Sequence, residues 1–258
     1  MKKNAIVNLK GGLGNQIFQI AFALELRSRN IRTICDTHFY DSNMKFPRSL
    51  ELEPKSFGMS SIKFKNNKIF SRMNSLFQEL DTFNFDDLKY LNRFVGYYQD
   101  FMILENHKKL IKNALGLNNP QYSNELVAIH IRQNDYKEIN QDLSDSYYKK
   151  SINDLLNLNK NLLFDVFTDD KNFVPNLNIF KRLNHVYYPD KKIKPLEVFR
   201  DMCRYKNYII ANSSFSALAA YLSDSDDKTV FYPNPWYRSS ESQIRNIPAS
   251  WVQVINKK

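Results

Sequence analysis

A glycine-rich segment near the start of the sequence combines residue types that could bind a phosphorylated ligand. It reads GGLGNQ at positions 11–16 and lies between a strand-like and a helix-like segment. Glycines let the backbone approach a ligand closely, and the first amides of the following helix are free to bind an anion. The segment lacks the third glycine of the dinucleotide fingerprint and the Lys-Ser/Thr of a P-loop. A tight strand-to-helix turn is the alternative, but Asn15 and Gln16 favour hydrogen bonds to a polar ligand.

A histidine and an arginine share one face of a second segment, HIRQNDY at positions 130–136. This segment continues the apolar run LVAIHI, which predicts a strand over 126–131. Alternate residues of a strand point the same way, so His130 and Arg132 are expected on one side of it. Arginine offers a planar fork of donors that matches phosphate oxygens. A structural ion pair between Arg132 and Asp135 is the alternative.

Two further polar segments also follow predicted strands. Asp169 and Asp170 end FTDD at positions 167–170, where paired carboxylates could bind a metal ion or accept hydrogen bonds from guanine. A metal would need further oxygen ligands that are not obvious nearby, and capping of the next helix is the alternative. NSSFS at positions 212–216 places hydroxyls before a helix, which favours an anion, although Ser213 could serve only as an N-cap. Together the four segments describe a site for a phosphorylated nucleotide.

The elements around these segments alternate between strands and helices. In the first half, strands over 5–9 and 31–35 enclose a helix over 15–28, and a further strand is expected over 91–98. In the second half the patterns predict strands over 126–131, 162–167, 186–188, 208–211 and 229–232, and helices over 144–156, 195–205 and 213–222. Such alternation indicates parallel sheets covered on both faces. We therefore predict an α/β protein of two lobes, 1–120 and 121–258, with a polar linker over 117–124 and the ligand in the cleft between the lobes.

Composition restricts the class of protein. The chain has 258 residues, 43% of them hydrophobic and 25% charged, as in an ordinary globular protein. The most apolar run, 17–26, is too short to span a membrane, and the N-terminus does not resemble a secretory signal, so we expect a cytoplasmic protein. Cys35 and Cys203 are expected to be buried thiols, and the 4 histidines do not have metal-ligand spacing.

The net charge of +10 suits an anionic partner. A phosphorylated substrate, a nucleic acid and an anionic membrane surface would each fit, and so would a surplus that serves only solubility. The lysines are dispersed and no nucleic-acid module is recognisable, so nucleic acid is not expected as a partner. Peripheral binding to the inner face of an anionic membrane stays open.

Taken in order, these segments resemble the motifs of the bacterial α-1,2-fucosyltransferases. GGLGNQIFQ at 11–19 resembles the opening motif of that family, and HIRQNDY is similar to its H-x-R-R-x-D-Y motif. Three further matches are GYYQ at 96–99, FTDD at 167–170 and NSSFSALAAYL at 212–222, and the ending is matched by Pro235-Trp236 and PASW at 248–251. The resemblance therefore covers nearly the whole chain. The departures are Gln133 and Asn134, where family members usually carry a second arginine and often a glycine.

This resemblance implies a GT-B-type fold of two Rossmann-like lobes. Residues 1–120 would form the acceptor side and 121–258 the GDP-fucose-binding side, with the last helix packing back on the first lobe. It also implies an inverting enzyme that uses GDP-β-L-fucose without a metal or other cofactor. Arg132 would bind the β-phosphate, and His130 with Asp169 or Asp170 would contact the guanosine. The expected donor-binding residues are Gly12, Gly14, Asn15, Gln16, His130, Asp169, Asp170, Asn212, Ser213, Ser214, Phe215 and Ser216.

The expected reaction is transfer of L-fucose to a glycan hydroxyl, the 2-hydroxyl of galactose, in surface polysaccharide or O-antigen synthesis. Arg132 would stabilise the departing GDP, and Asp135 is the candidate base, with Glu138 as the runner-up. Asp135 could instead hold Arg132 in place. A transferase for another GDP-sugar or linkage is the alternative enzyme. A basic nucleic-acid or membrane-surface module is the non-enzymatic alternative, but it leaves the polar clusters at the strand ends unexplained.

Overall fold

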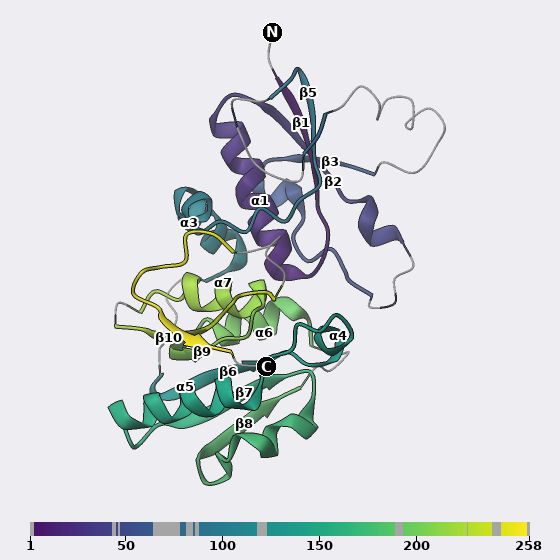
Figure 1. Cartoon of the computed structure of the whole chain (residues 1–258). Coiled ribbons are helices and arrows are strands. Elements are labelled where there is room, and N and C mark those ends of the chain that lie inside the picture. The colour runs from purple at the N-terminus through teal and green to yellow at the C-terminus, as the bar shows by residue number, and fades with distance from the viewer. Residues whose placement is uncertain are drawn as a thin grey trace. The chain divides into compact units, whose positions relative to one another are not determined.

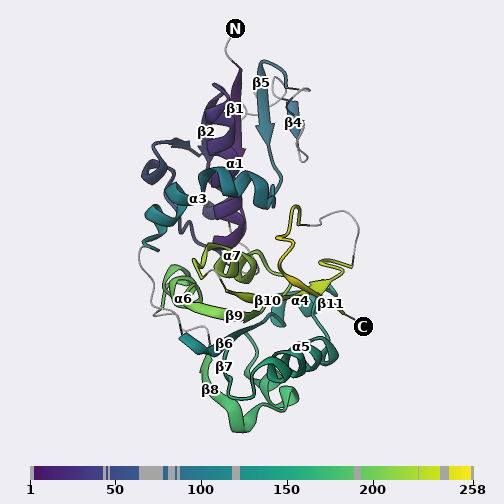
Figure 2. The same cartoon turned by 90° about the vertical axis from the view of Figure 1, so that its left-hand side faces the viewer.

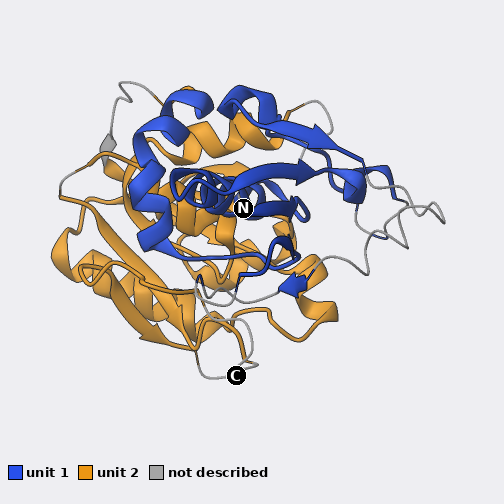
Figure 3. Cartoon of the chain, turned by 90° about the horizontal axis from the view of Figure 1, so that it is seen from above, with its two compact units in different colours: residues 1–115 blue, residues 116–258 orange. Residues whose placement is uncertain are grey.

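The computed structural model describes residues 3–42, 45, 47–63, 78–80, 85, 88–117, 123–188, 193–225, 227–238 and 244–256. The chain divides into two compact units, Met1–Leu115 and Gly116–Lys258, which Figure 3 shows in different colours. The division falls five residues before the boundary predicted at 120/121. Residues 118–122 of the predicted linker lie outside the described residues.

The first unit contains a five-stranded parallel sheet in the order β3-β2-β1-β5-β4. Figure 1 labels β1, β2, β3 and β5, and Figure 2 labels β4. Its strands are β1 (Asn4–Asn8), β2 (Arg32–Asp36), β3 (Ser60–Ile62), β4 (Gln78–Leu80) and β5 (Leu91–Phe94). Its helices are α1 (Leu13–Ser28), α3 (Phe101–Leu115) and the 3₁₀ turns η1 (His38–Asp41) and η2 (Pro54–Phe57). The predicted βαβ unit is confirmed as β1-α1-β2. The predicted strand over 91–98 ends earlier, at Phe94.

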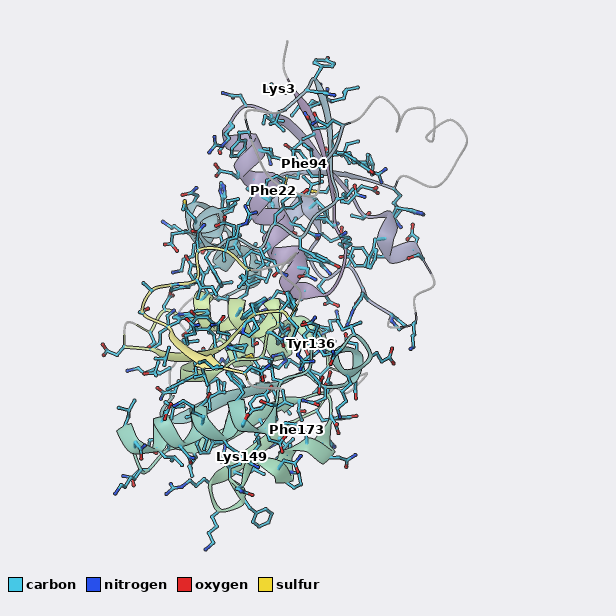
Figure 4. The ribbon with its side chains drawn as sticks, viewed as in Figure 1. Lys3, Phe22, Phe94, Tyr136, Lys149 and Phe173 are labelled. Atoms are coloured by element: carbon cyan, nitrogen blue, oxygen red, sulfur yellow. The ribbon has the colours of Figure 1, made fainter. Side chains whose placement is uncertain are left out.

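Aromatic side chains fix α1 against this sheet. Phe22 meets Phe94 edge-on with ring centroids 4.9 Å apart, and both are labelled in Figure 4. Phe22 also stacks on Tyr98 with ring centroids 4.0 Å apart, and Tyr98 in turn meets Phe94 edge-on. Because Phe22 and Phe94 are fully buried, each contributes about 2–3 kcal/mol of hydrophobic stabilisation. The carboxyl end of β5 is therefore held firmly against α1.

The second unit contains a six-stranded parallel sheet in the order β11-β10-β9-β6-β7-β8. Its strands are β6 (Ser123–Ile131), β7 (Leu163–Thr168), β8 (Leu183–Tyr187), β9 (Tyr205–Ile209), β10 (Thr229–Asn234) and β11 (Val252–Ile255). Its helices are α4 (Asn134–Glu138), α5 (Asp145–Leu158), α6 (Pro195–Met202), α7 (Ser214–Leu222) and the 3₁₀ turns η3 (Lys171–Leu177) and η4 (Phe180–Arg182). The strands and helices predicted for this half are confirmed, with boundaries that shift by a few residues.

The expectation of a final helix is wrong. The last described element is β11, which pairs in parallel with β10. Its sequence, VQVI, is rich in β-branched residues, which suit a strand better than a helix. This strand completes the edge of the second sheet.

Helices cover both faces of this second sheet (Figure 2). Figures 1 and 2 agree in placing α5 on one side and α6 and α7 on the other. Ile129 and Ile131 join the apolar cluster beneath α5, whereas His130 lies on the opposite side, 5.8 Å from the Phe215 ring. The alternation along β6 is therefore the one that the sequence predicts.

Other expectations concern single residues. Cys35 and Cys203 are buried thiols, as predicted. Ser144 caps α5 by accepting a hydrogen bond from the backbone N of Tyr147, at the start of the helix that the sequence predicts over 144–156. Among the described residues, we find no helix with the length and apolar character needed to cross a membrane.

Candidate functional site

Three of the four polar segments meet at one edge of the second sheet. Strand β6 lies between β9 and β7, and all three run parallel, so their carboxyl ends lie side by side. Arg132 follows β6, Asp169 follows β7 and Asn212 follows β9. Ligands of open α/β sheets bind at this edge, so the topology supports a binding site here.

Arg132 lies between two carboxylates. Its Nη2 donates to Asp135 Oδ2 at 2.7 Å, and its Nη1 lies 3.4 Å from Asp169 Oδ2. Its guanidinium carbon is 5.7 Å from the centre of the Tyr136 ring. Burial opposes the charge of Arg132, but the hydrogen bond to Asp135 and the charges of both carboxylates outweigh it and raise its pKa. The guanidinium is therefore charged, oriented, and still 23% exposed as a side chain.

The structural ion pair between Arg132 and Asp135, which the sequence left as the alternative, is therefore present. It affects the role that Asp135 can play. One carboxylate oxygen of Asp135 is engaged by the Arg132 guanidinium at 2.7 Å, so that oxygen is not open to an acceptor hydroxyl. The geometry favours the role in which Asp135 holds Arg132. Asp135 as the base stays a prediction, as does Glu138.

The two aspartates after β7 have different surroundings. Asp169 Oδ1 accepts from the backbone N of Gln133 at 2.8 Å, and its carbonyl accepts from Asn134 Nδ2 at 2.7 Å. Asp170 caps η3 by accepting from the backbone N of Asn172, and its second oxygen accepts from Lys137 Nζ. Asp170 therefore takes the capping role, and Asp169 connects the ends of β6 and β7. Within the described ranges, no three His, Cys, Asp or Glu side chains come together as a metal site would require.

His130 lies beside this cluster as a neutral imidazole. Burial, with a smaller contribution from the charge of Arg132, lowers the pKa of His130 to about 3. Its ring is near Phe215 on α7, and its Nδ1 is buried without a hydrogen-bond partner. It can therefore offer one donor and one acceptor, but no charge, to a ligand.

The serine-rich turn leads from β9 into α7. Asn212 is buried and donates through Nδ2 to the carbonyl of Gln141 at 2.7 Å, which leaves its Oδ1 without a partner. Ser213 occupies the N-cap position but makes no side-chain cap to the helix. Ser216 is fully buried, and its hydroxyl donates to carbonyls of its own turn, Ser213 and Ala211. We therefore correct the prediction for Ser216, which shapes the turn from within and does not line the site.

Tyr136 connects the arginine to this turn. Its hydroxyl donates to the carbonyl of Asn212 at 3.2 Å, and its side chain also interacts with those of Tyr237 and Ser213. Tyr136 lies in α4 and is labelled in Figure 4. Burial raises its pKa, so the hydroxyl stays a donor at neutral pH.

The segment after α4 is fastened by a distant arginine. Arg238 donates through its backbone N to Gln141 Oε1 at 2.9 Å and through Nη2 to the carbonyl of Asp142 at 2.7 Å. Its Nη1 donates to the carbonyl and side chain of Asn140. We call this set of contacts the Arg238 clamp. It holds residues 140–142, one of which, Gln141, receives the amide of Asn212.

The fourth polar segment lies in the first unit, at the turn between β1 and α1. Gly11 has φ +81°, a conformation that favours glycine, and it accepts from the Tyr40 hydroxyl at 3.2 Å. Gly12 has φ −79° and ψ 178°, and a Cβ placed on it would meet none of the described atoms within 4 Å. Asn15 Oδ1 accepts from Gln99 Nε2 at 2.8 Å. The space in front of Gly12 is therefore open.

Gln16 is not available to a ligand. It is fully buried, and its Nε2 donates to the carbonyls of Gly11 and Ser49 while its Oε1 accepts from the backbone N of Glu51 and Leu52. These four hydrogen bonds use the whole capacity of an amide. We therefore correct the prediction for Gln16, which ties the glycine turn to residues 49–52. Gly14 is likewise buried inside α1.

The model of "Glycosyl transferase family 11" matches residues 90–254, which include the whole arginine site. This chain belongs to glycosyl transferase family 11. It is 26% identical over 297 residues to an alpha-1,2-colitosyltransferase of Escherichia coli, with 96% of this chain and 98% of the relative covered. It is 25% identical over 303 residues to the O-antigen biosynthesis glycosyltransferase WbnK of Escherichia coli, with 95% and 99% covered.

The fold agrees with this membership. The crystal structure of POFUT1 in complex with GDP matches with a TM-score of 0.50 and 9% identity, covering 90% of this chain and 98% of that one. The two parallel-sheet α/β units form a GT-B-type fold, as predicted. The protein is therefore a glycosyltransferase.

The site of this family 11 glycosyltransferase contains several residues for which the sequence predicted no role. Tyr136, Gln141 and Arg238 hold the ends of β6 and β9 together, and Gln99 holds Asn15. Tyr136 and Gln99 lie within motifs that the sequence already showed. These motifs are the signal from which a role for both residues could have been predicted. Gln141 and Arg238 are 97 residues apart, and no local pattern links them.

Buried polar atoms without a partner gather at the same edge of the second sheet. Among the described residues, they include His130 Nδ1, both amide atoms of Gln133 and Asn212 Oδ1. Each such group costs about 1–3 kcal/mol when it stays unpaired. The free protein therefore carries unused hydrogen-bonding capacity around Arg132.

A stability measurement can test the state of Gln133. We expect Gln133→Met to leave the free energy of unfolding unchanged or to raise it by about 1–3 kcal/mol, because an unpaired amide is replaced by an apolar group of similar length. Gln16→Met is the matched control, since Gln16 is equally buried but fully bonded, and it should lose about 2 kcal/mol or more. Urea unfolding of the three proteins gives the comparison. Equal losses in both variants would mean that Gln133 has a partner in solution.

The buried histidine predicts a pH dependence of stability. An unfolded histidine has a pKa of about 6.5, so between that value and the folded pKa of about 3 only the unfolded chain binds the proton. Stability should therefore fall as the pH drops below about 6.5. We expect the Tm of the wild type minus that of His130→Gln to decrease steadily from pH 7 to pH 5. Parallel curves in a thermal-shift series would contradict a buried neutral His130.

Proposed function

We propose that this glycosyltransferase transfers L-fucose from GDP-β-L-fucose, with inversion, to the 2-hydroxyl of galactose in an acceptor glycan. The observation that supports it most directly is Arg132, held by Asp135 and Asp169 among unpaired buried polar atoms at the ends of three parallel strands. A charged, partly exposed fork beside buried groups with unused hydrogen-bonding capacity suits a diphosphate joined to a polar nucleoside and sugar. The motif resemblance supplies the identity of donor and linkage.

In the proposed reaction, the acceptor oxygen bonds to the anomeric carbon as the bond from that carbon to the β-phosphate oxygen breaks. The electron pair leaves with GDP, and the proton of the acceptor hydroxyl passes to a base. Negative charge grows on the β-phosphate, and Arg132 would stabilise it without the help of a metal. Asp169, His130 and Asn212 would bind the guanosine, while Ser213, Ser214 and Phe215 would line the diphosphate and nucleoside.

The relatives support a place for this reaction in surface polysaccharide synthesis. One of the two is an O-antigen biosynthesis glycosyltransferase, and the other is an alpha-1,2-colitosyltransferase. An acceptor saccharide on a lipid carrier would agree with this assignment, and the net charge of +10 would favour contact with the anionic membrane that holds such a carrier.

The similarity to the colitosyltransferase also favours another candidate donor. Colitose is fucose without its 3-hydroxyl, so a site that accepts GDP-colitose differs from one for GDP-fucose in a single hydroxyl group. The colitosyltransferase is similar over nearly the whole of both chains. Transfer of colitose is therefore the alternative to transfer of fucose.

The deciding experiment compares three donors with one acceptor array. GDP-fucose, GDP-colitose and GDP-mannose are each incubated with the enzyme in EDTA and a set of saccharides, most of which end in galactose, and the product linkage is read by NMR. The proposal predicts an α-1,2-fucosyl product that forms in EDTA. A colitosyl product alone would establish the second candidate. Turnover of GDP-mannose alone, or a strict need for a divalent metal, would reject both.

A further inference from the structure

The carboxyl ends of β1, β2 and β5 in the first unit gather side chains that the proposed donor site does not use. These strands are neighbours in the sheet order β2-β1-β5. Lys10 follows β1, Tyr40 lies in η1 after β2, and Tyr97 follows β5. Because the strands are parallel, the segments that follow them lie at one edge of the sheet, as at the arginine site of the second unit.

Tyr97 is presented by a constrained backbone. The next residue, Tyr98, has φ +50°, which is unfavourable for a bulky residue. Tyr98 is kept there because its ring stacks on Phe22 and its hydroxyl donates to the carbonyl of Leu80 at 2.6 Å and accepts from the backbone N of Gly96. Such strain costs about 1–3 kcal/mol and persists only where the surroundings impose it. Tyr97, in contrast, is left 42% exposed.

A buried amide fixes the two strand ends that carry Lys10 and Tyr97. Gln19 has no exposed surface; its Oε1 accepts from the backbone N of Lys10 at 3.0 Å and its Nε2 donates to the carbonyl of Gly96 at 3.1 Å. The Lys10 Nζ lies 4.8 Å from the centre of the Tyr97 ring, within the range of a cation–π contact. The aromatic ring and the ammonium group therefore form one prearranged surface.

The neighbouring turn is fixed in the same way and leaves room for a ligand. The Tyr40 hydroxyl holds the carbonyl of Gly11, and Gln99, two residues after Tyr97, holds Asn15. In the part of the chain that the structure describes, no atom is found within 4 Å of the position that a Gly12 Cβ would take. The edge thus combines an exposed ring, a cation and an open, rigid turn.

Such a combination suits a sugar ring. A pyranose has one face of C–H groups that packs on an aromatic ring, and its hydroxyls at the rim accept from ammonium and amide donors. Sites of this kind place a few fixed polar groups around an apolar contact. We propose that Tyr97 and Lys10 form the binding surface for the acceptor glycan, with one pyranose packed on the exposed part of the Tyr97 ring and a hydroxyl accepting from the Lys10 ammonium. This assignment rests on the proposed transfer to a glycan and names the residues that hold its acceptor.

The test uses two tyrosines from opposite ends of β5. Tyr97→Ala should raise the KM for the acceptor at least 10-fold, which is about 1.4 kcal/mol, and leave the Kd for GDP within about 2-fold of wild type. Tyr97→Trp, which keeps an aromatic face, should recover most of the affinity. Tyr90→Ala is the matched control, because Tyr90 is 51% exposed and lies at the amino end of the same strand. Lys10→Met should raise the acceptor KM several-fold.

An unchanged acceptor KM in Tyr97→Ala, or an equal weakening of GDP binding and acceptor binding, would overturn the assignment. A loss shared by Tyr90→Ala would do the same, because it would indicate general damage to the first unit. Failure of the proposed function is seen separately, as absence of GDP-fucose turnover by the wild type. In that case the acceptor surface is tested without donor, by binding of the wild type and Tyr97→Ala to a glycan array. Weaker glycan binding by Tyr97→Ala would support the surface, and equal binding would reject it.

Discussion

Replacing Arg132 by alanine should reduce kcat by a factor of about 10² to 10³ or more. Removal of one prearranged hydrogen-bond donor to developing charge commonly costs that much, and Arg132 supplies a full positive charge. The variant also removes the positive charge that lies 2.7 Å from Asp135 and 3.4 Å from Asp169, so both carboxylates would face a diphosphate without it. Steady-state kinetics with GDP-fucose, and calorimetric titration with GDP, measure the two consequences.

Conservative and remote substitutions separate charge from fold. Arg132→Lys keeps the charge but loses the planar fork, so it should recover GDP binding more than kcat. Lys149→Ala removes an exposed cation of α5 that pairs only weakly with Asp145, at 3.8 Å, and should retain full activity. Retention of more than about a tenth of the wild-type rate by a folded Arg132→Ala would remove Arg132 from the mechanism.

Gly12→Ala should reduce kcat/KM about 10²-fold or more while leaving the fold intact. Gly12 has φ −79° and ψ 178°, which alanine adopts without strain, and the added methyl would meet no atom of the described residues within 4 Å. A penalty can therefore arise only if a ligand approaches the backbone there, where a displacement of about 1 Å can cost 10²-fold in rate. We therefore expect Gly12→Ala to have the same Tm as the wild type and a much lower activity.

The adjacent glycine provides the opposite case. Gly11 has φ +81°, and a Cβ there would lie 2.6 Å from Asn15 Nδ2. Gly11→Ala should therefore lower stability by about 1–2 kcal/mol before any ligand is present. If Gly12→Ala is as active as wild type, the glycine turn is only a structural turn, which was the alternative that the sequence left open.

The arrangement of the arginine site could be predicted because it depends on short-range patterns. The apolar run that ends at Ile131 identifies β6, and parallel strands place their following residues at one edge. His130 and Arg132 were expected on one side of the strand, and the structure places His130 beside α7, opposite the apolar cluster under α5. The positions of the FTDD and NSSFS segments follow from the same rule.

The errors concern residues whose role is decided by distant parts of the chain. In the sequence, Asn15 and Gln16 are two adjacent amides that could play the same role. In the structure, only Gln16 has its hydrogen-bonding capacity filled by residues 49–52. Asp169 and Asp170 are likewise neighbours, but η3 takes one as its cap. The strand β11 forms because β10 offers an edge with which it can pair. Its four residues are too few for a local sequence pattern to predict that pairing.

The Arg238 clamp has a consequence for the synthesis of the enzyme. Arg132 is translated near the middle of the chain, but the loop beside it is fastened by a residue roughly a hundred positions later. A nascent chain that has already exposed the first unit and the strand β6 still lacks this fastening. We therefore expect nucleotide affinity to appear late on the ribosome, only after residue 238 has left the exit tunnel.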